Sequence, residues 1–264
     1  MRYGVAITDA VDARTLADLA VDAEAAGWHG VFYWDGGRND AWMALAAAAM
    51  RTERVRLGTM VTPLPRQQPW KVASEAATLD QLSGGRAVLP VGLGVVEFET
   101  TGISKDYTVR ARMLDEGLEV VAGLWTGQPY HFEGAYYQLE ETTGPTPVQM
   151  PRVPIWVVGG PKQSQIRRAA RWDGALVQGT PDQIRERVAA ITALRASARP
   201  LEVITEAETP GDDPERAAET VRPFAEAGVT WWMEAVWHTP YESGGVEGIR
   251  RRITQGPPLD SGDR

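Results

Sequence analysis

The chain has 264 residues, 43% of them hydrophobic, with a formal net charge of −8 and no cysteine. This composition excludes disulfides, thiolate metal sites and cysteine nucleophiles, and the three widely separated histidines argue against a zinc site. Scattered basic residues argue against nucleic acid as a partner, and no run of about 18 apolar residues predicts a membrane span. Because a strand is predicted directly after Met1, we expect no signal peptide and a soluble, cytoplasmic protein.

Eight short apolar runs, each followed by an apolar stretch of helical spacing, dominate the pattern. The predicted strands cover 4–8, 31–35, 55–61, 87–94, 155–159, 175–179, 201–205 and 229–237. Parallel strands need a crossover between them, usually a helix, so repeated units of this kind indicate a parallel sheet. Eight units predict an α/β fold, a (β/α)8 TIM barrel of about 250 residues whose chemistry lies on the loops after the strands. We expect one such domain over residues 1–264.

Clear end signals mark three of the helices between the first strands. The first is predicted over 13–26 and ends at Gly27, a residue typical of helix C-termini. Asp40 is expected to cap the second, over 41–50. The third is predicted over 69–82, with a proline at its start and glycines beyond its end.

The stretch 127–154 is the least regular part of the chain. Alternating aromatic residues over 130–137 predict a β-hairpin that turns at Glu133 and Gly134. Strands and helices resume in phase afterwards, so we expect a small hairpin insertion between the fourth helix and the fifth strand of the barrel. The end of the chain, 256–264, is predicted to be frayed.

The sharpest local signal is the segment 157–168, where an apolar strand runs into Gly159 and Gly160 and then into a helix. Glycines allow a ligand to approach closely, and a helix N-terminus offers free N–H groups and a positive dipole end. These features suit a phosphate, with an ordinary strand-to-helix turn as the alternative. Side chains that could assist are those of Lys162, Ser164, Arg167 and Arg168.

Two other strand ends contain glycine. The triplet 92–94, Gly-Leu-Gly, begins like a dinucleotide-binding fingerprint but lacks its third glycine. Its glycines would keep the barrel mouth open for a flat ligand or form a tight turn. The segment from Gly58 to Pro63 predicts a bulge or strained backbone, with ordinary strand termination as the alternative.

Ionisable residues that follow the predicted strands are the candidate acids and bases, with caps or solvated loop residues as the alternative. They include Asp9, Asp35, Glu206 and His238. Asp35 and His238 are the strongest candidates for catalysis, because Trp34 and Trp237 beside them could line a pocket. The consecutive Trp231 and Trp232 must face opposite sides of their strand, so only one can point into the barrel.

Longer segments resemble the luciferase-like flavin-dependent oxidoreductases, the bacterial luciferase-like monooxygenase family. The most specific segment is 78–86, Thr-Leu-Asp-Gln-Leu-Ser-Gly-Gly-Arg. The order and approximate spacing of other segments also match, so the resemblance spans nearly the whole chain. These other segments are 55–66, 69–73, 91–94, 124–127, 154–160 and 168–174.

The resemblance implies a barrel that binds FMN or its deazaflavin analogue F420 at the C-terminal mouth, and it implies a homodimer. The cofactor phosphate would lie near Val158, Gly159, Gly160 and Pro161, with Gln178, Gly179 and Thr180 close by. The ring would lie over Thr59, Met60 and Val61, where relatives have a bulge with a non-prolyl cis peptide, and beside Leu93 and Gly94.

The chain departs from this family pattern at two positions. Many relatives end the second strand with Asp-His where this chain has Asp35-Gly36, and Val95 stands where some F420 relatives carry glutamate. The usual catalytic histidine and acid are therefore missing. Either His238, Asp35 or Glu97 replaces them, or the substrate reacts without acid/base help from the protein.

The sequence thus predicts an F420- or FMN-dependent oxidoreductase that transfers a hydride or activates oxygen, because such cofactors carry most of the chemistry themselves. F420 is slightly favoured, because the basic residues after the fifth strand would suit its acidic tail. An apolar mouth indicates a hydrophobic small-molecule substrate; its expected members are Trp34, Trp42, Met60 and Trp237. The alternative is a non-catalytic flavin- or F420-binding barrel. A barrel lyase or aldolase would need a lysine on a strand, and the predicted strands have none.

Overall fold

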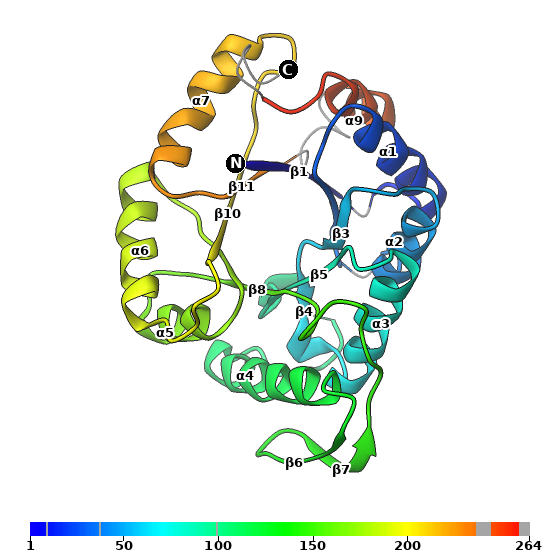
Figure 1. The fold of residues 1–264 in the computed structure, drawn as a ribbon, viewed down its shortest axis with the longest axis vertical. Helices are drawn as coiled ribbons and strands as arrows, with labels where there is room; N and C mark the ends of the chain where they lie inside the picture. The colour runs from blue at the N-terminus through cyan, green and yellow to red at the C-terminus, as the bar shows by residue number, and fades with distance from the viewer. Residues whose placement is uncertain (9, 37, 99, 236–243, 259–264) are drawn as a thin grey trace.

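The computed structural model shows eight parallel strands that close into a barrel within the described part of the chain (Figure 1). The structure describes residues 1–8, 10–36, 38–98, 100–235 and 244–258. The barrel strands are β1 (Arg2–Ile7), β2 (Gly30–Tyr33), β3 (Arg56–Thr59), β5 (Ala87–Gly92), β8 (Ile155–Val158), β9 (Gly174–Leu176), β10 (Glu202–Ala207) and β11 (Trp231–Ala235). Pairing of β3 with β5 closes the ring, and the short β4 (Thr62–Pro63) extends the wall next to β5. The predicted TIM barrel is confirmed.

Helices cover the outside of the barrel (Figure 1). They are α1 (Ala13–Ala25), α2 (Ala41–Ala49), α3 (Pro69–Leu82), α4 (Tyr107–Leu124), α5 (Gln163–Arg171), α6 (Pro181–Leu194), α7 (Pro214–Glu226) and α9 (Gly245–Thr254), with 3-10 turns η1 (Leu64–Arg66) and η2 (Val96–Phe98). The Asp40 carboxylate accepts a 2.8 Å hydrogen bond from the N–H of Met43, so the predicted cap of α2 is confirmed. No helix within the described ranges is both long and apolar enough to cross a bilayer.

The two consecutive tryptophans of β11 belong to different apolar layers. Trp231 lies inside the barrel, where its ring centroid is 5.4 Å from that of Trp156 and 6.1 Å from that of Phe32. Trp232 lies outside it, with its ring 5.3 Å from that of Phe224 on α7. One therefore fills the barrel and the other joins the strand to the helical shell, as strand alternation predicts.

The family-like segment 78–86 holds together the end of the barrel where the strands begin. The buried Asp80 carboxylate accepts hydrogen bonds from the side chain of Gln149 at 2.7 Å and from the N–H of Val148 at 2.8 Å. Arg86 donates to the main-chain oxygens of Thr52 and Val55, both at 2.7 Å. This segment is structural, because its polar groups are used by the loops that lead into β3 and β8.

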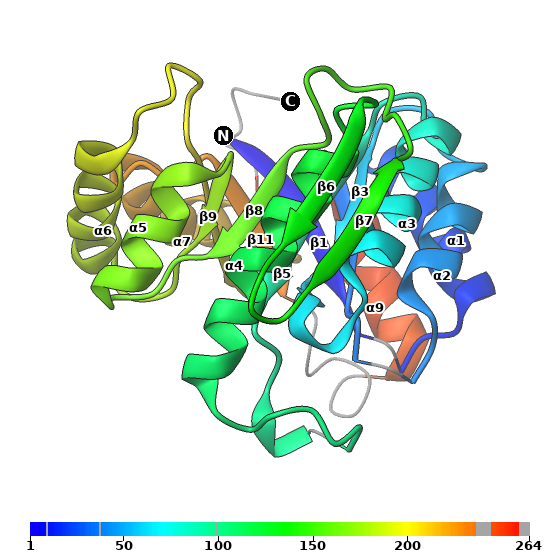
Figure 2. The ribbon, with the colours of Figure 1, turned by 90° about the horizontal axis from the view of Figure 1, so that it is seen from below.

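A hairpin lies beside α4, apart from the barrel sheet (Figure 2). Its antiparallel strands are β6 (Pro129–Glu133) and β7 (Gln138–Thr143). The Glu116 carboxylate on α4 accepts hydrogen bonds from the N–H groups of Ala135 and Tyr136, at 3.0 and 2.8 Å. The turn therefore occupies 134–137, so the aromatic pair Tyr136 and Tyr137 stands in the turn rather than on the second strand. At the chain end, residues 257 and 258 are buried, and 259–264 lie outside the described residues.

Candidate active site

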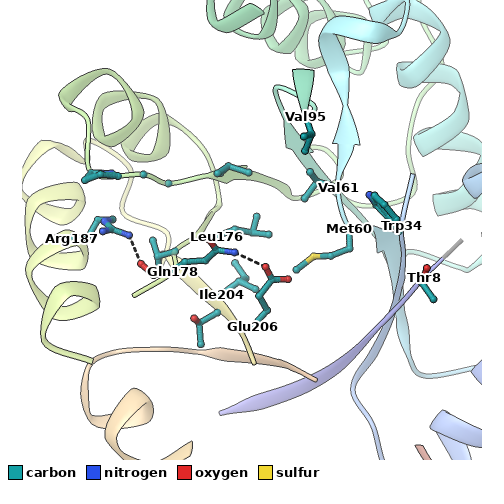
Figure 3. A pocket seen from close by; sticks show the side chains of 16 residues that line it. Thr8, Trp34, Met60, Val61, Val95, Leu176, Gln178, Arg187, Ile204 and Glu206 are labelled. Atoms are coloured by element: carbon teal, nitrogen blue, oxygen red, sulfur yellow. Dashed lines mark hydrogen bonds between the residues drawn. The ribbon is translucent and has the colours of Figure 1, made fainter. Parts of the chain in front are cut away.

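A cavity of about 700 Å³ opens at the end of the barrel where the strands finish (Figure 3). This volume is within the usual range of small-molecule sites, about 300–1,000 Å³. Much of its wall is a ring of side chains at the ends of the strands. Each of these residues lies two positions after a residue that points into the barrel, and residues two apart on a strand share the same face. The ring residues Thr8, Trp34, Val158, Gln178 and Glu206 follow the inward-facing Ala6, Phe32, Trp156, Leu176 and Ile204 in this way.

The wall of the cavity is polar on one side and apolar on the other. On the polar side, the Gln178 amide donates a 2.6 Å hydrogen bond to Glu206 Oε1, and Arg187 on α6 donates a 2.8 Å hydrogen bond to the main-chain oxygen of Gln178 (Figure 3). The apolar side is formed by Met60, Val61, Val95 and Val158. The apolar Leu176 and Ile204 lie beside Gln178 and Glu206 (Figure 3). A ligand with a flat apolar part and a charged part would match this division.

The apolar wall includes the peptide that the resemblance singles out. The Met60–Val61 bond is cis, as expected, and both side chains line the cavity. Thr59 is fully buried. Its hydroxyl forms hydrogen bonds with the Thr62 hydroxyl at 2.8 Å and with the main-chain oxygen of Pro90 at 3.2 Å. Of the three residues expected below the ring, Met60 and Val61 therefore line the cavity and Thr59 does not.

Leu93 and Gly94 stand behind the wall rather than on it. Neither lines the cavity, whereas Val95 does and is half exposed. Gly94 has φ +75, and a Cβ there would lie 3.0 Å from that of Pro63. This glycine therefore lets the loop after β5 pack closely on the end of β4.

The loop after β8 carries the predicted phosphate segment. Val158, Gly159, Gly160 and Pro161 all line the cavity, and α5 begins just beyond them. The Gln165 side chain accepts a 3.1 Å hydrogen bond from the N–H of Lys162, and a Cβ on Gly160 would lie 2.2 Å from the same Gln165 oxygen. A side chain at position 160 would therefore require the Gln165 side chain to move from its place at the start of α5.

A second helix begins at the same edge of the cavity. Gln178 lines the cavity, whereas Gly179 and Thr180 do not; they lead into α6, whose first turn Thr180 caps. Two helices therefore begin next to this edge, which Arg187 lines, and free N–H groups at helix N-termini favour anions. The residues present fit a phosphate group.

The basic side chains expected to assist the phosphate are only partly available. Arg168 is buried and donates to the Asp115 carboxylate on α4 at 2.9 Å, so the expectation for this residue is wrong. Lys162 and Arg167 are exposed and do not line the cavity. Arg187, which was not predicted from the sequence, does line the cavity. Its position three residues after the buried Ile184 is the helical spacing that could have revealed it.

Of the two residues expected to act in catalysis, only Asp35 lies in the described part of the chain. Asp35 does not line the cavity, and its Oδ2 is buried without a hydrogen-bond partner in the described structure. Burial raises the pKa of this carboxyl to about 6, and the Thr62 hydroxyl and Arg66 oppose that rise. His238, together with Trp237, lies outside the described residues. Glu97, the further candidate, is exposed on η2.

Of the other tryptophans expected at the mouth of the barrel, Trp34 lines the cavity and Trp42 does not. Trp34 lines the cavity beside Met60 (Figure 3). Trp42 is buried in the helical shell and does not reach the cavity, because α2 packs its face against neighbouring helices. Within the described ranges, no three His, Asp or Glu side chains gather as a metal site would require.

Comparison with known proteins gives a family match and several relatives. A family model described as luciferase-like monooxygenase matches residues 1–256. The F420-dependent glucose-6-phosphate dehydrogenase of Kineococcus radiotolerans is 38% identical over 157 residues, which are 55% of this chain and 46% of that protein. The oxygenase component of the flavin-dependent trigonelline monooxygenase of Acinetobacter baylyi is 30% identical over 177 residues, 63% of this chain and 48% of that protein. The chain thus spans about half the length of the curated relatives it matches.

Solved structures of low sequence identity share the fold over almost the whole chain. An F420-dependent secondary alcohol dehydrogenase with an F420–acetone adduct aligns with a TM-score of 0.82 and 19% identity, covering 98% of this chain and 99% of that one. The coenzyme F420-dependent tetrahydromethanopterin reductase of Methanopyrus kandleri gives 0.80 and 18%, covering 97% and 98%. The family match over residues 1–256 agrees with this shared barrel and confirms the resemblance found in the sequence. The chain belongs to the luciferase-like monooxygenase family.

Proposed function

We propose that the chain is an oxidoreductase that uses F420 or FMN to oxidise, reduce or oxygenate a small, largely apolar organic molecule. The observation that supports this most is the division of the cavity between the Met60–Val61 wall and the edge formed by the loop 158–161 with Arg187. A tricyclic ring with a phosphorylated side arm has the same two parts. Relatives named for F420 or flavin dependence support the same conclusion.

Each part of the site has a distinct task in this proposal. The loop amides after β8 and Arg187 bind the phosphate, while Met60 and Val61 pack against one face of the ring and set its orientation. Leu176 and Ile204 keep water from the deep part of the cavity. When bound, the cofactor supplies hydride transfer or oxygen activation, which side chains alone do not provide.

Asp35 and His238 remain the proposed candidates for acid/base catalysis. Asp35 does not line the cavity, but with a pKa of about 6 its carboxyl can hold or release a proton near neutral pH. The homodimer and the cytoplasmic location remain predictions from the sequence.

Titration of the purified protein with FMN and with F420, followed by absorbance and fluorescence, tests the cofactor. We expect saturable binding of at least one of them, and no binding of either at millimolar concentration would contradict the proposal. A steady-state assay of the loaded protein with a panel of alcohols, aldehydes and amines then tests turnover. Tight cofactor binding without turnover across a broad panel would favour the non-catalytic binding protein instead.

A further inference from the structure

Glu206 is the one carboxylate that lines the cavity within the described part of the chain. It ends the inner face of β10, two residues after the fully buried Ile204, so its side chain belongs to the ring that forms the cavity wall. Figure 3 shows it between Gln178 and Met60, directed into the open space. Strand geometry, rather than a loop, therefore fixes this charge at the mouth of the barrel.

The carboxylate keeps acceptor capacity for a ligand. Oε1 accepts the 2.6 Å hydrogen bond from the Gln178 amide, and no described residue donates to Oε2. An ionised carboxylate has about four acceptor positions on its two oxygens, so one amide donor leaves most of them open. The neighbouring wall residues Met60, Leu176 and Ile204 provide no donor.

The positive charge of the cavity is held apart from Glu206. Arg187 donates to the main-chain oxygen of Gln178, whereas Glu206 accepts from the side chain of the same residue. Figure 3 shows Arg187 on the α6 side of Gln178 and Glu206 on the side that faces Met60. Arg187 therefore lies at the proposed phosphate edge, whereas the Glu206 carboxylate faces the part of the cavity next to Met60 (Figure 3).

We propose that Glu206 selects substrates that carry a positively charged nitrogen, a protonated or quaternary amine with apolar substituents. An opposite charge in an apolar cavity is attracted more strongly than in water, and a phosphorylated substrate would be repelled from the same position. The indole of Trp34 on the wall offers a second favourable surface for an organic cation. This inference rests on the proposed function only in that the substrate shares the cavity with the cofactor.

A matched pair of small molecules tests the charge preference without turnover. Choline and 3,3-dimethylbutan-1-ol have nearly the same shape, but only choline carries the quaternary nitrogen. Ligand-observed NMR titrations of the full chain, with and without the cofactor that it binds, would give both affinities. We expect the wild-type protein to prefer choline by roughly 5-fold or more, as one ion-pair contact of about 1 kcal/mol provides.

Two variants assign the preference to its residue. Glu206→Gln keeps the shape and the hydrogen bond to Gln178 but removes the charge, and we expect it to bind both compounds equally. Glu208→Gln removes the same charge from an exposed position two residues further on and should keep the preference. Equal binding of both compounds by the wild-type protein, no binding of choline at millimolar concentration, or a preference that survives in Glu206→Gln would each overturn the proposal. The separate FMN and F420 titrations show whether the cofactor assignment fails as well.

Discussion

Arg187 donates a 2.8 Å hydrogen bond to the main-chain oxygen of Gln178, which fixes a guanidinium at the edge of the cavity where two helices begin. The arginine comes from the middle of α6, whereas Gln178 precedes that helix. The bond therefore orients the side chain before any ligand is present, so little additional ordering is needed when an anion binds.

Replacing Arg187 by alanine should weaken FMN binding about 10-fold, because a charge-assisted contact to the phosphate is lost. Riboflavin, which has the same ring but no phosphate, should bind the variant and the wild-type protein equally. Arg185→Ala is the matched control, since Arg185 is exposed on the same helix and pairs with Asp182. Fluorescence titrations measure all three, and an equal loss for riboflavin would show that the arginine acts on the fold instead.

Asp35→Asn should stabilise the protein at alkaline pH. The folded-state pKa of about 6 lies above the ordinary 3.8, so between these values the folded protein holds more protons than the unfolded chain. Wild-type stability therefore falls as the pH rises through this window, and the penalty is complete above about pH 7. Because the side chain keeps some exposure, we expect a gain of about 1–2 kcal/mol for the variant at pH 8 and none near pH 3.5. Urea unfolding at both pH values checks this, with exposed Asp212→Asn as the control; a gain of equal size at both would contradict the assignment.

Asp80→Ala should destabilise the protein by about 3 kcal/mol, because several N–H groups that it satisfies would stay buried without an acceptor. Cofactor affinity should stay unchanged at temperatures where the variant is folded, since Asp80 lies at the opposite end of the strands. Thermal unfolding and an FMN or F420 titration measure the two effects. The exposed Asp212→Ala should change neither, and a selective loss of cofactor affinity in Asp80→Ala would assign the family-like segment to the active site after all.

Glu116→Ala should loosen the hairpin turn alone. Its carboxylate accepts from the N–H groups of Ala135, Tyr136 and Tyr137, and these would exchange with solvent once the acceptor is removed. Amide hydrogen exchange should rise over 134–137, while protection in β5 and β8 stays the same. Faster exchange throughout the barrel would instead mean that the hairpin supports the whole fold.

The barrel could be predicted because each of its strands is an apolar run with its own helix, and the periods of strand and helix are visible in the residues. The capping role of Asp40 and the opposite faces of Trp231 and Trp232 followed from the same local rules. The loop 158–161 was found for a related reason, since glycines at a strand end mark where a chain can meet a ligand, whereas the Met60–Val61 wall was implied by the family resemblance.

The parts that were missed depend on which way a long side chain turns. Arg167 and Arg168 are adjacent in the sequence, yet Arg168 points to Asp115 on α4, and nothing local to α5 indicates that partner. Arg187 lies outside the glycine loop in sequence and comes to the cavity only through the packing of α6. Burial of the Asp35 carboxyl likewise depends on β4 and α3 coming together around it.

The two-residue spacing between the filled interior of the barrel and the ring around its mouth has a consequence for variation. The interior of the barrel is filled by residues such as Ala6, Trp156 and Ile204. The cavity wall is lined by the residues two positions further along the same strands, Thr8, Val158 and Glu206. Changes in these wall residues can therefore accumulate without disturbing the packing below them. A new ligand preference can arise on this scaffold through exchanges at a few strand tips, while the architecture beneath is inherited intact.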